Sequence, residues 1–255
     1  MLQKRVIPVL LLQDGGLVKT TRFKNPVYIG DPINAVRIFN EKEVDELVVL
    51  DIDASKKNRQ PDYALLEKLA GEAFMPVAYG GGVKSREQVR QLLRLGLEKI
   101  IINTAIHSTP GLLASLSEEF GASSIVAGVD VRKNLLGKNE VYIKGGTQKL
   151  PGKLLEICQQ MEKQGAGEVL LHSIDRDGTM KGYDIAMVKE IAAQLSVPVI
   201  ACGGAGGLQH IGEANQSTNA GAFAAGSMFV FHGPHKAVLI SYPGYNALKK
   251  ILSNG

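Results

Sequence analysis

The fold is decided by the stretch Val48-Val49-Leu50-Asp51-Ile52-Asp53, which recurs in the second half of the chain as Val169-Leu170-Leu171-His172-Ser173-Ile174-Asp175. A glycine-rich turn follows each copy at a similar distance, first Gly80-Gly81-Gly82 and later Gly203-Gly204-Ala205-Gly206. The two sets are offset by roughly 120 residues, which is half the length of a typical (β/α)8 barrel. The repeat therefore predicts an α/β protein, a (β/α)8 TIM barrel built from two duplicated half-barrels.

Apolar runs rich in β-branched residues mark the expected strands of this barrel, at residues 6–12, 46–52, 77–79, 99–102, 125–130, 168–174, 199–202 and 220–225. Segments with helical periodicity lie between them, at residues 32–43, 63–73, 86–95, 110–120, 154–164 and 185–195. Asp31 and Pro32 are typical N-cap and first-turn residues for the first of these helices. Because the composition shows no break, we expect residues 1–255 to form a single barrel domain.

Two segments interrupt the alternation of strands and helices. Residues 13–30 are too long for a minimal strand-to-helix connection and predict a lid or binding loop. Residues 134–151 contain a short β-rich run beside paired glycines and predict a small hairpin insertion. Proline and glycine near the C-terminus predict a short last helix.

Composition excludes several classes of function. The net charge of +4 is mild, and the acidic and basic residues are interspersed along the chain. Neither nucleic acid nor a membrane surface is therefore expected as a partner. Cys158 and Cys202 lack the spacing of a zinc site or a disulfide, which favours free thiols in a reducing cytoplasm. We expect a cytoplasmic protein with no metal and no cofactor.

Both glycine-rich turns are candidate anion sites, because backbone without side chains lets amides approach an anion beside a helix N-terminus. Glycine turns after strands are also common structural devices, but two at equivalent places favour a pair of phosphate sites. A phosphorylated small molecule with a phosphate at each end is then the expected ligand. The predicted binding residues are Gly81, Gly82, Asn103 and Thr104 in the first half, and Gly203, Gly204, Gly226 and Ser227 in the second.

Asp130 is the candidate catalytic residue, because it ends an apolar strand whose C-terminal end should face the barrel mouth. Its alternative role is to cap the next loop. The polar run Asp175-Arg176-Asp177-Gly178-Thr179 follows another strand. Its carboxylates Asp175 and Asp177 could bind substrate or simply tie this loop together.

These motifs, with Tyr79-Gly80-Gly81-Gly82-Val83, Ile102-Asn103-Thr104-Ala105 and the opening Lys4-Arg5-Val6-Ile7, resemble HisF, the cyclase subunit of imidazole glycerol phosphate synthase. The resemblance runs from the first residues to about Phe231. It implies a lyase-family enzyme subunit that pairs with a HisH-like glutaminase as a heterodimer. It also implies that ammonia passes through the barrel to a bis-phosphorylated substrate. The positions that match the family's charged ammonia gate are Arg5, Glu46, Lys99 and Glu168, although four such charges could also form an ordinary salt-bridge ring.

The chain departs from the family's pattern at one catalytic position. The family uses two aspartates as general acid and base; Asp130 matches the second, but Leu11 stands at the first. Asp14 lies close by in sequence and would need a rearranged loop to substitute. The combination resembles HisF paralogues of surface-polysaccharide pathways, which implies ammonia supply to a third enzyme, a sugar amidotransferase that amidinates an acetamido nucleotide sugar in lipopolysaccharide synthesis. The alternative is an active cyclase of histidine biosynthesis, and an isomerase of the same barrel family is disfavoured because it also needs the missing aspartate.

Overall fold

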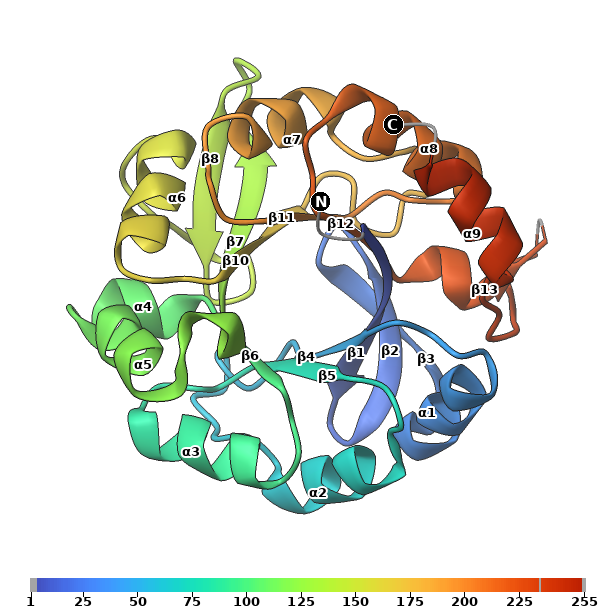
Figure 1. The fold of residues 1–255 in the computed structure, drawn as a ribbon, viewed down its shortest axis with the longest axis horizontal. Coiled ribbons are helices and arrows are strands. Elements are labelled where there is room, and N and C mark those ends of the chain that lie inside the picture. Colours follow the sequence, from blue (N-terminus) through green and yellow to red (C-terminus); the bar gives the residue numbers. More distant parts are fainter. Residues whose placement is uncertain (1–3, 234, 254–255) are drawn as a thin grey trace.

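Eight parallel strands close into a barrel in the computed structural model, which describes residues 4–233 and 235–253. Figure 1 looks down the barrel, with the strands at the centre and the helices around them. The barrel strands are β1 (Arg5–Gln13), β4 (Leu47–Asp51), β5 (Val77–Gly80), β6 (Lys99–Ile102), β7 (Ile125–Lys133), β10 (Glu168–Ser173), β11 (Val199–Cys202) and β12 (Ala222–Ala225). The (β/α)8 barrel predicted from the duplicated sequence is confirmed.

Strand pairing shows how the barrel closes. Each of these strands pairs in parallel with its neighbour, and the pairing of β7 with β10 completes the ring. The two half-barrels meet where β6 pairs with β7 and where β12 pairs with β1. In the β7–β10 pair, His172 of β10 is the register partner of Asp130 of β7. In the resulting ring β1 lies opposite β7, with three strands between them on either side. Side chains at the C-terminal ends of all these strands therefore share one face.

The helices follow the predicted periodicity and end within a few residues of the predicted bounds. They are α1 (Pro32–Glu41), α2 (Tyr63–Glu72), α3 (Arg86–Arg94), α5 (Leu112–Phe120), α6 (Leu154–Lys163), α7 (Ile185–Ala192) and the short last helix α9 (Tyr245–Leu252). Asp31 caps α1 as predicted, since its side chain accepts from the amide of Asn34, and Pro32 begins that helix. Two further helices, α4 (Thr104–Ser108) and α8 (Leu208–Ser217), carry weaker apolar patterns and were not predicted from the sequence.

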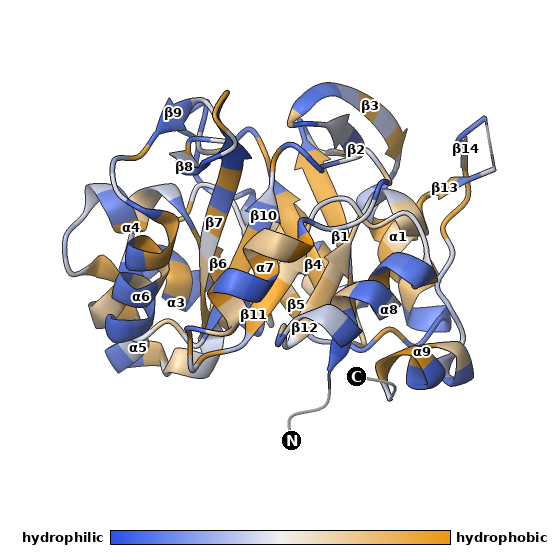
Figure 2. Ribbon diagram, turned by 90° about the horizontal axis from the view of Figure 1, so that it is seen from above, coloured by the Kyte–Doolittle hydropathy of each residue, from blue (hydrophilic) through white to orange (hydrophobic). Residues whose placement is uncertain are grey.

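The segment 13–30, predicted as a lid or binding loop, is a β-ribbon, so the prediction was wrong about its secondary structure, although its residues do line cavities on this face. It forms β2 (Gly16–Thr21) and β3 (Lys24–Gly30), which extend the barrel antiparallel to β1. Asp14 and Gly15 both have positive φ, the conformation of a two-residue hairpin turn, and this tight turn sends the chain straight back from β1. The ribbon stands on the face where the barrel strands end (Figure 2).

The predicted hairpin insertion is present on the same face. It pairs an extended β7 with β8 (Asn139–Ile143), followed by β9 (Gln148–Lys149). A small separate hairpin, β13 (Phe231–His232) with β14 (Ala237–Val238), precedes α9. The β2–β3 ribbon and the β7–β8 hairpin lie on the face at the C-terminal ends of the barrel strands, where barrel enzymes build their sites.

Alternation along the strands divides the core into two clusters. One cluster packs between the barrel and the helices, and the other fills the barrel interior with small and branched residues, among them Ile7, Val48, Ala78, Leu170 and Ala222. The interior is therefore a packed apolar column between the two faces. Within the described part of the chain, no helix has the length and apolar character needed to cross a membrane.

Candidate functional site

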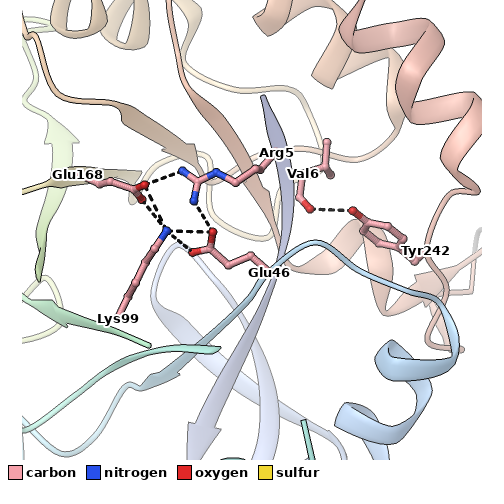
Figure 3. A network of polar contacts seen from close by, with 6 residues as sticks. All are labelled: Arg5, Val6, Glu46, Lys99, Glu168 and Tyr242. Atoms are coloured by element: carbon pink, nitrogen blue, oxygen red, sulfur yellow. Dashed lines mark hydrogen bonds and ion pairs between the residues drawn. The ribbon is translucent and has the colours of Figure 1, made fainter. Parts of the chain in front are cut away.

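A closed ring of ion pairs lies at the N-terminal end of the barrel interior (Figure 3). The Arg5 guanidinium bonds Glu46, and it also bonds Glu168 at 2.8 Å. The Lys99 ammonium bonds the same two carboxylates, at 3.1 Å to Glu46 and 3.2 Å to Glu168. Each cation thus bridges both anions. The four residues predicted as a gate are brought together, from the starts of four strands.

The ring is largely removed from solvent. Side-chain exposure is 4% for Glu46 and 22% for Arg5, with the other two members between these values. Each of these charges would be costly to bury alone, so each is stabilised here by its ion pairs with the two opposite charges. The C-terminal tail reinforces this face, since the Tyr242 hydroxyl donates to the Val6 carbonyl at 2.8 Å.

A cavity of about 120 Å³ opens at the other end of the barrel. Its wall includes the first glycine turn, where Gly81 has a φ of 133° and a Cβ would come within 2.7 Å of the Asp51 carbonyl oxygen. Only glycine fits that position. The cavity brings the predicted first-half residues Gly81, Gly82, Asn103 and Thr104 together with the predicted catalytic residue Asp130.

A second, smaller pocket of about 20 Å³ adjoins the first. Leu11 and His172 line both pockets, so they form the boundary between them. The second pocket brings together the predicted second-half residues Gly203, Gly204, Gly226 and Ser227. The two glycine turns therefore face one shared mouth, as the duplication predicts.

Lys19 occupies the second pocket and was missed as a site residue in the sequence. Its side chain is buried and its ammonium donates to the Val9 carbonyl at 2.5 Å. A Cβ on Gly226 would come within 2.5 Å of the same nitrogen. Across residues 4–233 and 235–253 no carboxylate lies within ion-pair distance of Lys19, and burial lowers its pKa to about 8. A buried ammonium paired only with a carbonyl is suited to binding an anion.

Asp130 stands in the mouth as predicted. The Asn103 side-chain amide donates to its Oδ2 at 2.9 Å. Burial raises the pKa of Asp130 to about 6, against the opposing effect of His172. A carboxyl group that titrates near neutrality can both accept and return a proton.

Leu11 holds the place opposite Asp130, because β1 and β7 lie on opposite sides of the barrel. Its side chain is buried against Val9, Val18 and Cys202 in the interior cluster. Asp14 does not replace it, because its carboxylate pairs with Lys57 at 3.1 Å and Arg59 at 3.2 Å outside the mouth. The mouth therefore has a carboxylate on the β7 side and a hydrocarbon on the β1 side.

The two loop carboxylates after β10 serve structural bonds in this structure. Asp175 accepts from the Lys133 amide at 2.7 Å and does not line either pocket of the mouth. Asp177 lines the second pocket, and its Oδ2 accepts from the Thr20 hydroxyl at 2.7 Å and the Phe23 amide at 3.1 Å. The loop-tying alternative accounts for both, and Asp177 ties the β2–β3 ribbon over the mouth.

His172 is the second residue that sequence reasoning missed. It is the next-to-last residue of β10 and lies beside Asp130, and its imidazole is buried between Asp130 and Asp177. The signal was present, since a histidine lay near the C-terminal end of a predicted strand that would pair with the strand carrying Asp130. Reading register between neighbouring strands would have placed the two side chains together.

Fold and site together define a class: a duplicated (β/α)8 barrel with an ionic ring at one end and a two-cradle mouth at the other. The profile of the family described as "Histidine biosynthesis protein" matches residues 5–234. The chain belongs to this family, among the HisF-type subunits of imidazole glycerol phosphate synthase.

Three relatives show where it stands within the family. A Pseudomonas aeruginosa protein named "Putative imidazole glycerol phosphate synthase subunit hisF2" is 52% identical over 97% of this chain and 99% of its own length. The Vibrio vulnificus protein named "Putative imidazole glycerol phosphate synthase subunit hisF3" is 47% identical over 99% of this chain and 97% of its own. The Streptococcus sanguinis "Imidazole glycerol phosphate synthase subunit HisF" is 39% identical over 90% of this chain and 91% of its own.

The buried ammonium predicts a particular dependence of stability on pH. Because the pKa of Lys19 falls from 10.5 to about 8 on folding, the unfolded chain binds the extra proton between these values. The free energy of unfolding should therefore rise from pH 8 to above pH 10, by up to about 3 kcal/mol from this group. Lys19→Met should remove that part of the slope in denaturant titrations. Equal slopes for the two proteins would show that the ammonium is not buried as described.

Proposed function

We propose that this chain is the ammonia-receiving barrel subunit of a glutamine amidotransferase complex. A HisH-like glutaminase docks at the N-terminal face, and ammonia passes the ring of Arg5, Glu46, Lys99 and Glu168 into the barrel. The observation that carries the proposal is this ring, because it surrounds the entrance to the apolar interior with buried, mutually neutralised charges. Family membership supports the proposal, since the relatives are named as subunits of a synthase.

The apolar interior suits ammonia rather than ammonium. An ion would lose its hydration in the column lined by Ile7, Val48, Leu170 and their neighbours, whereas a small neutral molecule loses far less. The ring then acts as a selective entrance, because its carboxylates are already paired with Arg5 and Lys99 and so offer little attraction to an arriving ammonium ion. Ammonia leaves beside Leu11 and His172, where the two pockets of the mouth meet.

The mouth is proposed to bind a phosphorylated small molecule with one phosphate at each cradle. Lys19 supplies the charge at the second cradle, and the start of α4 lies beside the first. The loss of an acid or base opposite Asp130 argues against efficient cyclisation by the two-aspartate route. We therefore propose that ammonia is passed on to a third protein, a sugar amidotransferase that converts an acetamido group of a nucleotide sugar into an acetamidino group during lipopolysaccharide or O-antigen synthesis.

A second candidate function is cyclisation itself, as in histidine biosynthesis, yielding imidazole glycerol phosphate and an aminoimidazole carboxamide ribotide. The observation that favours it is Asp130, whose pKa of about 6 keeps it able to carry a proton at neutral pH. The same barrel would then serve as a lyase-type synthase subunit.

Reconstitution of the complex tests the main proposal. The chain, a glutaminase subunit and the sugar amidotransferase are mixed with glutamine, ATP and the acetamido nucleotide sugar, and the acetamidino product is measured. We expect product from glutamine only when all three proteins are present, and product from ammonium chloride without the glutaminase. Equal glutamine-dependent product in the absence of this chain would refute the proposal.

A further inference from the structure

Large apolar side chains are exposed to water on the two ribbons beside the mouth. Leu135 and Leu136 form the tip of the β7–β8 hairpin, where Leu135 is fully exposed and Leu136 is 81% exposed. Val27 and Tyr28 lie on β3, and Tyr28 is 67% exposed. The hairpin extends β7 and the β2–β3 ribbon extends β1, which lies opposite β7 in the barrel. The two apolar pairs therefore flank the mouth from opposite sides (Figure 2).

The hairpin does not need its two leucines. Its tip is held by Asn134, whose Oδ1 accepts from the amides of Leu136 at 2.9 Å and Lys138 at 3.0 Å. Both bonds use backbone donors, and tight turns ordinarily carry small polar residues. The leucine side chains are thus kept in water by a rigid turn to which they contribute nothing. A fixed apolar tip of this kind is suited to contact with another molecule.

The strand β3 lies at the edge of the sheet. Within the described part of the chain it pairs with β2 alone, and its residues from Lys24 to Tyr28 are exposed. An apolar edge strand attracts unwanted pairing unless something covers or interrupts it. Pro26 interrupts it here, because proline has no amide hydrogen to donate to an added strand. A partner would therefore contact β3 through the side chains of Val27 and Tyr28.

Positive charge surrounds these apolar side chains. Arg22, Lys24 and Lys138 are exposed, and across residues 4–233 and 235–253 no carboxylate lies within ion-pair distance of them. The acids on the same ribbons are already neutralised, Asp14 by Lys57 and Arg59 and Glu140 by Lys149. The three cations line neither pocket of the mouth, so they do not face a ligand bound there. An apolar surface with an acidic rim would complement this face.

The position of this face indicates which molecule covers it. Ammonia leaves the barrel between the two ribbons, and in neutral water most of it becomes ammonium, which has no lone pair for nucleophilic attack. A protein that uses the ammonia must therefore sit over the mouth and exclude water from it. A second copy of the chain is disfavoured, because a two-fold symmetric dimer would bring the same positive charges face to face.

We propose that the β2–β3 ribbon and the β7–β8 hairpin form the docking surface for the ammonia-accepting sugar amidotransferase. Leu135 and Leu136 anchor it on one side of the mouth, and Val27 and Tyr28 anchor it on the other. The inference rests on the proposed function and deepens it, since it assigns the third protein to the face opposite the glutaminase. The amidotransferase meets this chain with apolar residues surrounded by carboxylates, and the mouth is enclosed between the two proteins.

Binding of the purified amidotransferase to the immobilised full chain tests the proposal, with the dissociation constant measured by biolayer interferometry. The double substitutions Leu135→Ser with Leu136→Ser, and Val27→Thr with Tyr28→Ser, should each weaken binding by on the order of 10-fold or more. Phe74→Ser is the matched control, because Phe74 is also highly exposed but lies between α2 and β5, at the other end of the barrel. It should leave binding of the amidotransferase unchanged. Unchanged binding of the glutaminase shows that each variant is folded.

The charges give a second measurement. Binding should weaken as salt is raised, and Arg22→Gln with Lys24→Gln should reduce that dependence on salt. The proposal is overturned if the unmodified chain does not bind the amidotransferase, if both apolar double variants bind as tightly as the unmodified chain, or if Phe74→Ser weakens binding equally. A dimer of the chain alone, seen by sedimentation and abolished by the same double substitutions, would assign the face to a second copy and also overturn it.

Product assays separate docking from ammonia passage. In the reconstituted complex the apolar double variants should form less acetamidino product from glutamine, because ammonia escapes at the open mouth. Their glutamine hydrolysis, and the product formed from added ammonium chloride, should stay unchanged. Binding is measured without glutamine or the glutaminase, so it does not depend on ammonia passage. Glutamine-dependent product that needs this chain but is unaffected by both double substitutions contradicts the docking surface alone, whereas product that does not need the chain contradicts the proposed function.

Discussion

Leu11→Asp is expected to raise cyclisation of the bis-phosphorylated ribulosyl substrate by about 100- to 10,000-fold, with ammonium chloride as the nitrogen source. The new carboxylate would lie at the boundary of both pockets, opposite Asp130, where Leu11 now lines the mouth. Lys19, whose ammonium bonds the carbonyl of Val9 on the same strand, would offset part of the cost of burying it. The measurement is product formation by the purified chain under substrate excess.

Leu11→Asn is the matched control, because it has the same shape and polarity without a titratable proton. It should gain no activity, and both variants should lose about 1–3 kcal/mol of unfolding free energy. Equal gains in the two variants would mean that polarity, not proton transfer, limits the reaction. Rapid cyclisation by the unmodified chain would instead favour the active-cyclase alternative.

Lys99→Met is expected to uncouple glutamine hydrolysis from amination while leaving the barrel folded. The substitution keeps the length of the side chain but leaves Glu46 and Glu168 sharing Arg5 alone. Breaking a buried charge network costs about 3–5 kcal/mol, and an unbalanced negative ring would retain ammonium at the entrance. Glutamine-dependent product should fall on the order of 10-fold, whereas product from added ammonium should change little.

Arg37→Met is the control for that experiment, because Arg37 pairs with Glu72 on the surface and its side chain is 58% exposed. Exposed pairs contribute little, so both activities and stability should stay close to those of the unmodified chain. A Lys99→Met variant that keeps full glutamine-dependent turnover would remove the gate from the account.

The barrel could be predicted from the sequence because duplication repeats both the hydrophobic pattern and the glycine turns. The ribbon β2–β3 could not, since Asp14-Gly15 was taken as part of a loop, although the pair forms a two-residue turn between strands. The helices α4 and α8 carry too few apolar residues for periodicity to mark them, and tertiary packing forms them. Local signals therefore predicted the repeating frame and the hairpin insertion, but missed the β2–β3 ribbon and these two helices.

The candidate site, like the fold, was predicted in part from the sequence. Glycine turns and strand-end residues such as Asp130 were recognisable because barrel geometry assigns their positions. Lys19 and His172 were not recognisable. The burial of Lys19 against a backbone carbonyl, and the register that places His172 beside Asp130, are properties of the folded chain. The roles of Asp175 and Asp177 also depended on backbone amides from distant segments, which no spacing in the sequence reveals.

The most direct test of ammonia passage is an isotope competition in the reconstituted three-protein complex. Glutamine labelled with ¹⁵N in its side-chain amide is the nitrogen donor, excess unlabelled ammonium chloride is present in the buffer, and the ¹⁵N content of the aminated sugar is measured at a pH that disfavours free ammonia. Passage through the ring and the barrel predicts product that keeps the full glutamine label. Product whose label is diluted to the composition of the bulk ammonium would contradict it.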